Sequence, residues 1–563
     1  MDPFTVAVLQ ESLIGIAGEM KAVTMKTAYT QIWKEQGDLS CCLMNANGEI
    51  VAQDPTGFPG HITTMPYQLQ GTLRCLGRDS LVPGDVLMTN DPYIGGTHLP
   101  DVMIARPLFW ASQLYGFACN RGHWADIGGM GPGSYSASTP EIYQEGLFVP
   151  PVKLFEAGKP NDAVIELVLG NVRNRSNAYG DLRAQYSSCH TAQRRVEELI
   201  QKYGLECLLQ VMDEVLTLGE AKTRQTIASF PDGVYHYRDC LDGDGLSDVQ
   251  VWVDLALTID GDELIADYSG SSRQSSGGIN CSHSATASGI QYAVKCMSDP
   301  DSPPNSGSYR PIRVITRPGT VLDAQPPAAM VGFGEISLRA MDVAFGALTQ
   351  VVPNLAVASG SGSTGVVVVG GRRSVPGRKP YFYALELSSG AYGARPDRDG
   401  LNAIRYGKGN AGHIPIEADE LENPLTFLRY EIVPDTGGPG RFRGGNGFCR
   451  VFRVDADDAV ICITADRDLT PPPGILGGQA GACARYMLDP NTPVARQLRS
   501  KVPYTPLRKG TVVWLQSAGG GGLGRPEDRS PDLIRRDLKN GYVTEEHSRS
   551  VYPHSVQPDP PTS

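Results

Sequence analysis

The sequence predicts an α+β protein of several domains, rich in β-structure, with mixed or antiparallel sheets and a helix-containing N-terminal region. A chain of 563 residues is too long for one hydrophobic core, so division into domains is expected. Its 65 glycines and 42 prolines indicate many turns and short strands rather than long helical bundles. Helical periodicity concentrates in the first half of the chain, and short apolar runs recur in the second.

The N-terminal region begins with a predicted amphipathic helix over residues 10–28, where apolar side chains recur at helical spacing. Next, two apolar runs joined by Asn-Ala-Asn-Gly (GDLSCCLMNANGEIVAQD) predict a β-hairpin with positive φ at Gly48. Residues 84–110 predict a strand, a turn-rich loop and a second strand, and LYGFACNRGHW predicts a third strand that ends near His123. A helical region is expected over residues 181–230.

From about residue 231 onward, short β-like runs predominate, among them VQVWVDLALTID, GVVVVGG, CRVFRV and TVVWLQS. One late helix is predicted near SPDLIRRDLKNG, with Ser530 as N-cap before Pro531. The predicted limits are an N-terminal α+β domain at 1–235, a middle β-rich domain at 236–350, a C-terminal β-rich domain at 351–550 and a disordered tail at 551–563.

Charge and composition exclude several classes of partner. The net charge of −11 argues against a nucleic-acid partner, because a phosphate backbone requires clustered Lys and Arg. No apolar run is long enough to cross a bilayer, and the N-terminus lacks the basic segment of a secretory signal. The 12 scattered cysteines contain no CxxC pair and indicate buried, reduced thiols. We therefore expect a soluble, cytoplasmic protein.

Two glycine-rich segments, GSGSTG (360–365) and GGGGLG (519–524), satisfy the GxGxxG pattern. A dinucleotide site also requires a preceding strand, a helix that starts at the motif and a later acidic residue. The first segment leads into the apolar run VVVVGG and the second into RPEDRSP, so tight turns are the better interpretation. The sequence also lacks a GxxxxGK[ST] phosphate-binding loop.

A histidine–aspartate cluster is the main candidate site in a chain with nine histidines. GGTHLPDV places His98 three positions before Asp101, and RGHWADIGG supplies His123. Two imidazoles and one carboxylate suit Zn, Mn or Fe, and Asp38 beside the predicted hairpin could supply a fourth oxygen. The alternative is ordinary loop chemistry, in which Asp101 caps a turn and the histidines form local contacts. Spacing alone does not decide between the two.

Eight longer segments carry a further signal: KEQGDLSCCLMNANGEIVAQ, NDPYIGGTHLPD, GHWADIGGMGPGS, EIYQEGLFVPPVKL, GDLRAQ, NSGSYRPI, GRFRGGNGFCR and SAGGGGLGRPEDR. Together they resemble the hydantoinase B family, which includes 5-oxoprolinases. These segments extend in consistent order from near residue 30 to near residue 550. The family comprises one subunit type of ATP-dependent hydantoinases, N-methylhydantoinase, 5-oxoprolinase and caprolactamase, and the homologous subunit of acetone and acetophenone carboxylases.

The resemblance implies a partner and a cofactor. Such subunits pair with a hydantoinase A-type subunit that binds ATP and Mg, which agrees with the missing phosphate-binding loop. We therefore expect a hetero-oligomer, a dimer of heterodimers. The resemblance also implies one divalent metal, Zn or Mn and alternatively Fe, with the ligands Asp38, His98, Asp101 and His123. Family members usually read E-R-x-D-F-S where this chain reads EQGDLS, so the surroundings of Asp38 differ.

Three activities follow from the resemblance. The first is ATP-dependent hydrolysis of a cyclic amide of the lactam, hydantoin or 5-oxoproline type, in which the partner phosphorylates the carbonyl oxygen and the metal activates water. The second is an ATP-dependent ketone carboxylase, in which an enol phosphate meets CO₂ at the same metal. The third is a non-catalytic scaffold subunit. The length of this chain is nearer that of lactam-opening members.

Two further residues are candidate catalytic groups. Asp126 and His61 are each a candidate general base, or an orienter of a metal ligand. For Asp126 the alternative is a turn cap before two glycines, and for His61 it is a buried core histidine. Arg121 and Asn90 are candidates for orienting substrate, and Glu145 is either a partner of neighbouring backbone or a catalytic group.

Overall fold

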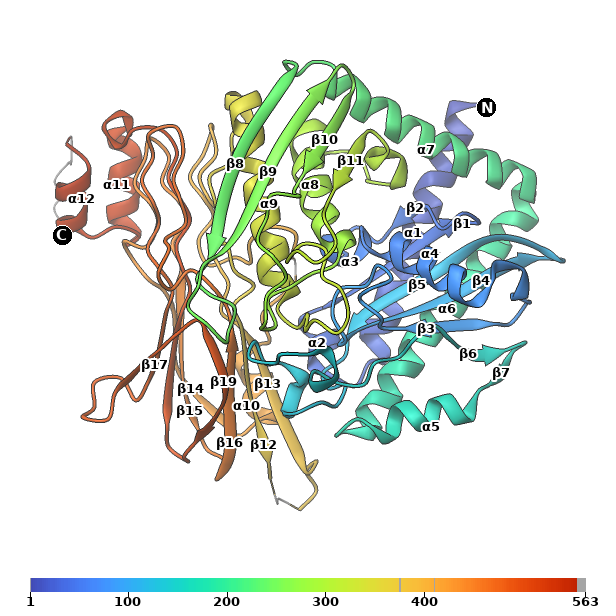
Figure 1. The fold of residues 1–563 in the computed structure, drawn as a ribbon, viewed down its shortest axis with the longest axis horizontal. Coiled ribbons are helices and arrows are strands. Elements are labelled where there is room, and N and C mark those ends of the chain that lie inside the picture. Colours follow the sequence, from blue (N-terminus) through green and yellow to red (C-terminus); the bar gives the residue numbers. More distant parts are fainter. Residues whose placement is uncertain (1, 374–375, 410, 554–563) are drawn as a thin grey trace, which may run out of the picture.

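The computed structural model describes residues 2–373, 376–409 and 411–553 (Figure 1). Helices and four sheets of seven, four, four and five strands alternate along the chain, which confirms the predicted α+β class. Among the described strands, only β10 (Glu263–Asp267) and β11 (Ile312–Ile315) pair in parallel. The N-terminal elements lie on one side of the molecule and the C-terminal sheets on the other.

The N-terminal sheet has seven strands in the order β2-β1-β5-β4-β3-β6-β7. Their bounds are Leu39–Asn45 (β1), Ile50–Gln53 (β2), Val86–Thr89 (β3), Asp101–Trp110 (β4), Gln113–His123 (β5), Val152–Glu156 (β6) and Lys159–Pro160 (β7). Strands β1 and β2 form the predicted hairpin, and Gly48 has φ +77° in its turn. Strand β5 lies between β1 and β4, so its end is surrounded by neighbouring strands on both sides.

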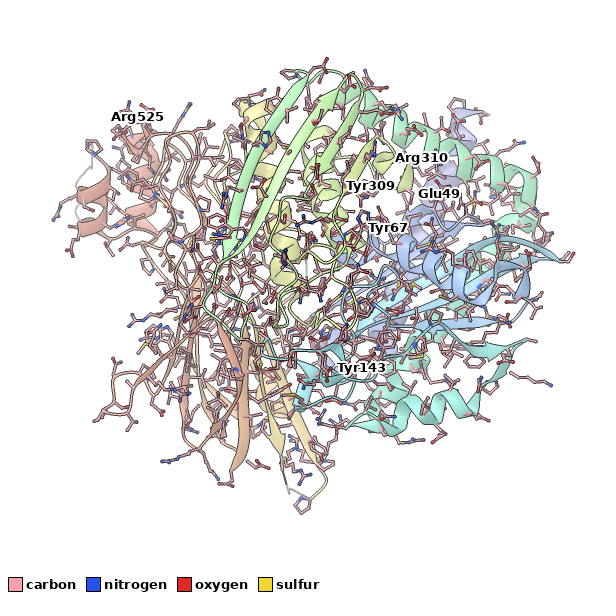
Figure 2. All side chains as sticks on the ribbon, viewed as in Figure 1. Glu49, Tyr67, Tyr143, Tyr309, Arg310 and Arg525 are labelled. Atoms are coloured by element: carbon pink, nitrogen blue, oxygen red, sulfur yellow. The ribbon has the colours of Figure 1, made fainter. Side chains whose placement is uncertain are left out.

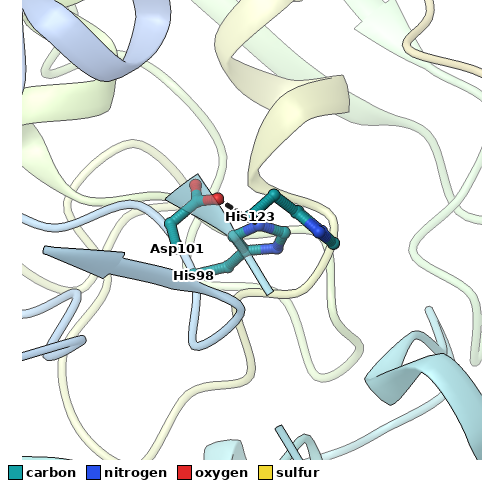
Figure 3. Close-up of side chains that lie close together, drawn as sticks. All are labelled: His98, Asp101 and His123. Atoms are coloured by element: carbon teal, nitrogen blue, oxygen red, sulfur yellow. Dashed lines mark ion pairs between the residues drawn. The ribbon is translucent and has the colours of Figure 1, made fainter. Parts of the chain in front are cut away.

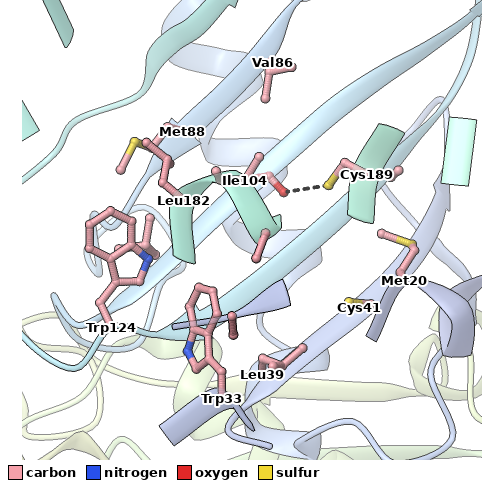
Figure 4. Packing of buried hydrophobic residues seen from close by; sticks show 14 of the residues in the cluster. Met20, Trp33, Leu39, Cys41, Val86, Met88, Ile104, Trp124, Leu182 and Cys189 are labelled. Carbon is pink, nitrogen blue, oxygen red and sulfur yellow. Dashed lines mark hydrogen bonds between the residues drawn. The ribbon is translucent and has the colours of Figure 1, made fainter. Parts of the chain in front are cut away.

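Helices cover both faces of this sheet. Helices α1 (Pro3–Thr27) and α6 (Arg175–Tyr203) pack on one face, and α4 (Met65–Leu76) packs on the other. Every residue of β1 is therefore buried. Cys41 belongs to the core beneath α1 and α6 (Figure 4), and Cys42 belongs to the core beneath α4. A strand buried on both faces is apolar throughout rather than alternating.

Two predicted helical regions are present with shifted limits. Helix α1 begins at Pro3, earlier than expected, because the Asp2 side chain caps the N–H groups of Phe4 and Thr5. The region expected at 181–230 is two helices, α6 and α7 (Leu205–Ile227), separated by Gly204 at φ +84°. The remaining N-terminal helices are α2 (Gln31–Lys34), α3 (Pro59–Ile62) and α5 (Asp162–Gly170).

The middle of the chain contains two helices that the sequence analysis did not predict. A four-stranded sheet of β8 (Gly233–Leu241), β9 (Val251–Asp260), β10 and β11 packs against α8 (His283–Ser298) and α9 (Phe333–Val351). Helix α9 is buried on almost all sides, and its polar residues Glu335, Arg339 and Asp342, which share one face, are buried too rather than exposed to solvent. The Arg310–Glu49 ion pair (2.7 Å) joins this region to the β1–β2 hairpin (Figure 2).

The C-terminal half is built from two sheets that share one core. One has the order β13-β12-β16-β19 and the other β14-β15-β20-β17-β18. The bounds are Val366–Arg372 (β12), Tyr381–Leu387 (β13), Leu425–Ile432 (β14), Phe448–Val454 (β15), Asp458–Thr464 (β16), Arg485–Leu488 (β17), Arg496–Leu498 (β18), Lys501–Leu507 (β19) and Val512–Gln516 (β20). Helix α10 (Ile416–Glu422) lies beside β14.

Both GxGxxG segments are loops without a helix that starts at the motif, as predicted. In the second, backbone segments approach too closely for any side chain. A Cβ atom at Gly519 would lie 1.8 Å from the Thr436 carbonyl oxygen, and one at Gly520 would lie 2.1 Å from that of Tyr392. The glycines therefore allow close packing of backbone, a role unrelated to a dinucleotide.

The end of the chain follows the predicted pattern. Helix α11 (Pro531–Lys539) begins after Ser530, whose side chain accepts the Asp532 N–H, and α12 (Glu545–Val551) follows. Most of the tail predicted to be disordered, residues 554–563, lies outside the described residues. Among the described helices, none combines the length and apolar character needed to cross a membrane.

A buried charge network joins the middle and C-terminal regions. Arg339 of α9 is fully buried and donates to Asp239 of β8 (2.8 Å) and to Asp466 (2.7 Å). Asp239 also accepts from Arg467 (2.6 Å), and Asp466 from Lys501 (2.8 Å). Each charge has a partner, which offsets the cost of removing it from water.

Candidate metal centre

Strand register brings three of the predicted metal ligands to one edge of the N-terminal sheet. Asp101 begins β4 and His123 ends β5, and these two residues are directly opposite each other in the antiparallel ladder. His98 precedes β4, and its carbonyl accepts the Asp101 N–H (3.1 Å). Two sequence segments about twenty residues apart therefore deliver their polar side chains to the same place (Figure 3).

The three side chains form a compact, buried group. One donor atom from each of His98, Asp101 and His123 lies within 4.8 Å of the other two, and none of the residues is more than 5% exposed. His98 Nε2 lies 3.2 Å from Asp101 Oδ1, and the two imidazole centroids are 5.1 Å apart. Two nitrogens and one carboxylate oxygen from ordered strand ends are a donor set that suits Zn, Mn or Fe.

Asp38, the fourth predicted ligand, lies beside this trio. It immediately precedes β1, and its backbone carbonyl accepts the His123 N–H (3.1 Å) because β1 pairs with β5. Its carboxylate Oδ1 is buried without a hydrogen-bond partner among the described residues. Asp38 is not one of the three residues whose donor atoms lie within 4.8 Å of one another.

Two buried polar atoms of this group have no hydrogen-bond partner among the described residues, as expected if they face a cation. They are His123 Nδ1 and Asp38 Oδ1. An unsatisfied buried donor or acceptor costs about 1–3 kcal/mol, a cost that a bound ion would remove. Burial, together with neighbouring His98, lowers the pKa of His123 to about 4, which keeps the imidazole in the neutral form that binds metals.

Electrostatics also favour the ligand form of Asp101. Although burial opposes ionisation, the neighbouring His61 and His98 side chains hold the pKa of Asp101 well below its usual value. Thr97 Oγ1 donates to Asp101 Oδ2 (2.5 Å) and orients the carboxylate. Asp101 is therefore an ionised carboxylate, as a metal ligand must be.

His61 lies next to the trio. It is on the short helix α3, is 2% exposed, and its Nε2 is 3.2 Å from Asp101 Oδ2. The Phe58 ring packs edge-on against it at 4.3 Å. Its Nδ1 has no hydrogen-bond partner among the described residues. His61 is thus positioned to orient Asp101 through one nitrogen while the other remains free.

Asp126 has a different environment. Its carboxylate accepts the N–H groups of Gly128 (3.1 Å) and Gly133 (3.2 Å). It also accepts the backbone N–H (3.0 Å) and Nη1 (2.9 Å) of Arg173. These four donors match the turn-cap alternative, and Asp126 holds the loop that follows His123.

The two residues considered for substrate orientation hold loops instead. The Asn90 side chain donates to the carbonyls of Leu99 and Leu147 and accepts the Val149 N–H, so it fixes the loop that carries His98. Arg121 is fully buried and donates to the His61 carbonyl (3.1 Å) at the end of α3. Asn90 therefore positions the loop that carries His98, and Arg121 positions the helix that carries His61.

Arg405 is a cation near the candidate centre. It comes from a loop that is distant in sequence, and its proximity was not predicted from the sequence. Its guanidinium carbon lies 5.4 Å from the centroid of the Phe58 ring, the same ring that contacts His61. Burial lowers the pKa of Arg405, and the nearby Asp38 carboxylate opposes this shift. Nη1 is buried and has no hydrogen-bond partner among the described residues. No motif in the surrounding segment, LNAIRYGKGNAGH, signals this proximity.

Comparison with known proteins identifies relatives along the whole chain. The chain is 30% identical to the B-type component of a putative D-/L-hydantoinase from Pseudomonas sp. (strain NS671), covering 98% of this chain and 95% of that protein. It is 27% identical to the 5-oxoprolinase of Dictyostelium discoideum over 94% of this chain, but spans only 41% of that longer protein.

Solved structures show the same fold. The ATP-dependent caprolactamase of Pseudomonas jessenii matches with a TM-score of 0.92 at 27% identity, over 99% of this chain and 97% of that chain. Acetone carboxylase in its nucleotide-free form matches with a TM-score of 0.89 at 21% identity, over 98% of this chain and 79% of that chain. The model of the hydantoinase B/oxoprolinase family matches residues 2–526. The chain belongs to the hydantoinase B/oxoprolinase family.

Proposed function

We propose that this chain is the metal-containing subunit of an ATP-dependent cyclic amide hydrolase, with a hydantoinase A-type partner that binds ATP and phosphorylates the substrate. The buried trio of His98, Asp101 and His123 is the observation that carries this proposal. The names of the relatives, which include a hydantoinase, 5-oxoprolinases and a caprolactamase, support the substrate class. In this assembly, proposed as a dimer of heterodimers, Asp38 would be the fourth metal ligand.

The chemical problem is the stability of the amide. Resonance makes its carbonyl carbon a poor electrophile and its nitrogen a poor leaving group, and phosphorylation of the carbonyl oxygen removes that resonance. When bound, a divalent ion would stabilise developing negative charge and make water more acidic. His98, Asp101 and His123 would hold the ion, and the burial of all three would limit its contact with bulk water.

His61 and Arg405 have separate roles in the proposal. His61 Nε2–H donates to Asp101 Oδ2 and orients that carboxylate, which leaves Nδ1 as the ring nitrogen that can accept a proton. Arg405 would bind the anionic phosphoryl group of the activated substrate, because its Nη1 has no hydrogen-bond partner among the described residues and can donate to phosphate oxygens.

Replacing Arg405 by methionine is expected to uncouple ATP hydrolysis from ring opening. The ratio of ring-opened product to ATP hydrolysed should fall about tenfold or more, since a hydrogen bond to a charged group contributes about 1.5–3 kcal/mol. ATP hydrolysis by the partner should continue. Arg194→Met, which removes a side chain 57% exposed on α6, is the control. An unchanged ratio in Arg405→Met would remove Arg405 from the proposal.

The activity itself is tested with the chain and its partner purified together. ATP would be supplied with hydantoin, 5-oxoproline, caprolactam, acetone or acetophenone, each with and without bicarbonate. We expect ring opening of one of the cyclic amides, independent of bicarbonate. Product formed only from a ketone with bicarbonate would show a carboxylase instead. Full activity of the partner alone would show that this chain is a scaffold.

A further inference from the structure

Glu145 is a buried carboxylate outside the candidate ligand set. It is 2% exposed, and its Oε1 accepts the Val331 N–H (2.8 Å) and the Thr139 hydroxyl (3.1 Å). Its Oε2 accepts the Met330 N–H (3.1 Å). Both oxygens therefore hold one short piece of backbone, which lies just before α9.

The same backbone contacts a candidate metal ligand. The Val331 carbonyl oxygen lies 3.3 Å from His98 Nδ1, on the side of the ring opposite the Nε2 atom that faces Asp101. Because a carbonyl only accepts, this contact places the proton on Nδ1 and leaves the Nε2 lone pair free. The Phe333 ring, two residues further along, packs against the His98 ring at 4.7 Å.

We propose that Glu145 is a positioning residue for the metal centre, acting on His98 through the backbone at Val331. Glu145 holds the N–H groups of Met330 and Val331, which belong to the two peptides before the Val331 Cα. The Val331 carbonyl belongs to the next peptide, whose Gly332 N–H donates to the Gly278 carbonyl (2.9 Å), so Glu145 and this bond hold the two sides of Val331 together. That carbonyl sets the tautomer and the rotation of the His98 ring. The inference rests on the proposed function, because it assumes that His98 Nε2 binds the metal.

This arrangement requires a carboxylate. Glutamine has nearly the same shape, but it replaces one acceptor oxygen by an NH₂ group, which cannot accept a hydrogen bond. In Glu145→Gln, one of the two backbone N–H groups would lose its acceptor, and the backbone before the Val331 carbonyl would be held less firmly, with the Gly332 N–H to Gly278 bond left on the other side. Residues that orient histidine ligands from outside the coordination shell typically change metal affinity about 10–100-fold when replaced.

The chain offers a matched control. Asp181 of α6 is also 2% exposed and accepts two backbone N–H groups, those of Tyr29 (2.6 Å) and Thr30 (3.3 Å), and the Thr30 hydroxyl (2.7 Å). The chemistry matches that of Glu145, but among the described residues neither Tyr29 nor Thr30 forms a hydrogen bond with His98, Asp101 or His123. Asp181→Asn should therefore reduce stability as Glu145→Gln does without altering the metal centre.

The test uses the full-length chain in complex with its partner. Kd for Zn²⁺ would be measured by competition with a chelator, and the visible spectrum of the Co²⁺-loaded protein would report the ligand geometry. We expect Glu145→Gln to raise Kd about 10–100-fold and to shift the Co²⁺ bands. Asp181→Asn should match wild type in both. Thr139→Val, which keeps both backbone contacts of Glu145, should change Kd by much less than Glu145→Gln.

The outcomes separate this inference from the proposed function. If His98→Ala binds Zn²⁺ as wild type does, His98 is not a ligand, and the proposed site fails. If His98→Ala loses the metal but Glu145→Gln matches wild type in Kd and spectrum, only the inference about Glu145 fails. An equal rise in Kd for Glu145→Gln and Asp181→Asn would also overturn it, because the change would then reflect general loosening of the fold.

Discussion

Replacing His98 by alanine is expected to abolish binding of the proposed divalent metal and to slow the proposed ring opening about a thousandfold or more. The reason is that only two ligands of the compact trio, Asp101 and His123, would remain, and two ligands are too few for a stable metal site. Charge stabilisation by a metal is worth several kcal/mol, and about 1.4 kcal/mol corresponds to a factor of ten in rate. His123→Ala should have the same effect, because its donor comes from the opposite strand of the same hairpin.

Elemental analysis of the purified complex and the rate of product formation are the two measurements. His190→Ala is the control, since this exposed histidine of α6 is remote in sequence from the trio. Circular dichroism should show that the variants remain folded, because alanine is smaller than histidine and introduces no steric clash. Metal content equal to that of wild type in both His98→Ala and His123→Ala would contradict the ligand assignment.

Replacing Arg339 by methionine is expected to destabilise the chain by about 3–5 kcal/mol, the typical cost of removing one partner from a buried ion pair. Asp239 and Asp466 would each lose a charge-assisted hydrogen bond in a buried region. Arg467 and Lys501 would still contact these carboxylates, so the lower end of the range is the closer expectation.

Urea denaturation, followed by fluorescence, measures this effect. The matched control is Arg194→Met, which breaks an ion pair with Glu198 on the surface of α6, where both side chains are about half exposed. That change should cost no more than about 0.5 kcal/mol. Similar unfolding midpoints for Arg339→Met and Arg194→Met would show that the buried network contributes little.

The sequence predicted correctly those elements that are determined by a few adjacent residues, such as a turn or a helix cap. The β1–β2 hairpin has its Asn-Gly turn, and α11 has its Ser-Pro start, so a few adjacent residues determine each one. Helices α8 and α9 were missed for the opposite reason. They are buried between a sheet and other elements, and their polar side chains, such as Arg339, are buried with the apolar ones. Neither helix therefore shows the division into a buried apolar face and a solvent-exposed polar face on which the periodicity argument depends.

The same distinction applies to the candidate site. His98, Asp101 and His123 could be proposed together because a single hairpin brings them together, and hairpin register follows from short-range pattern. Arg405 and Glu145 could not be assigned roles in this way. The hydrogen bond from Val331 to Glu145 spans 186 residues of sequence, and the contact of His98 with Val331 spans 233. Such contacts depend on how whole sheets and helices pack, which periodicity does not reveal.

The 233-residue span between His98 and Val331 has a consequence for biogenesis. At about 5–20 residues per second, a ribosome needs roughly 10–50 s to add the segment that separates them. Throughout that interval the emerging imidazole lacks the carbonyl that selects its tautomer. The apo-centre therefore matures only after more than half of the polypeptide has been translated, and a fragment that stops at residue 235 would carry every candidate ligand yet bind metal weakly.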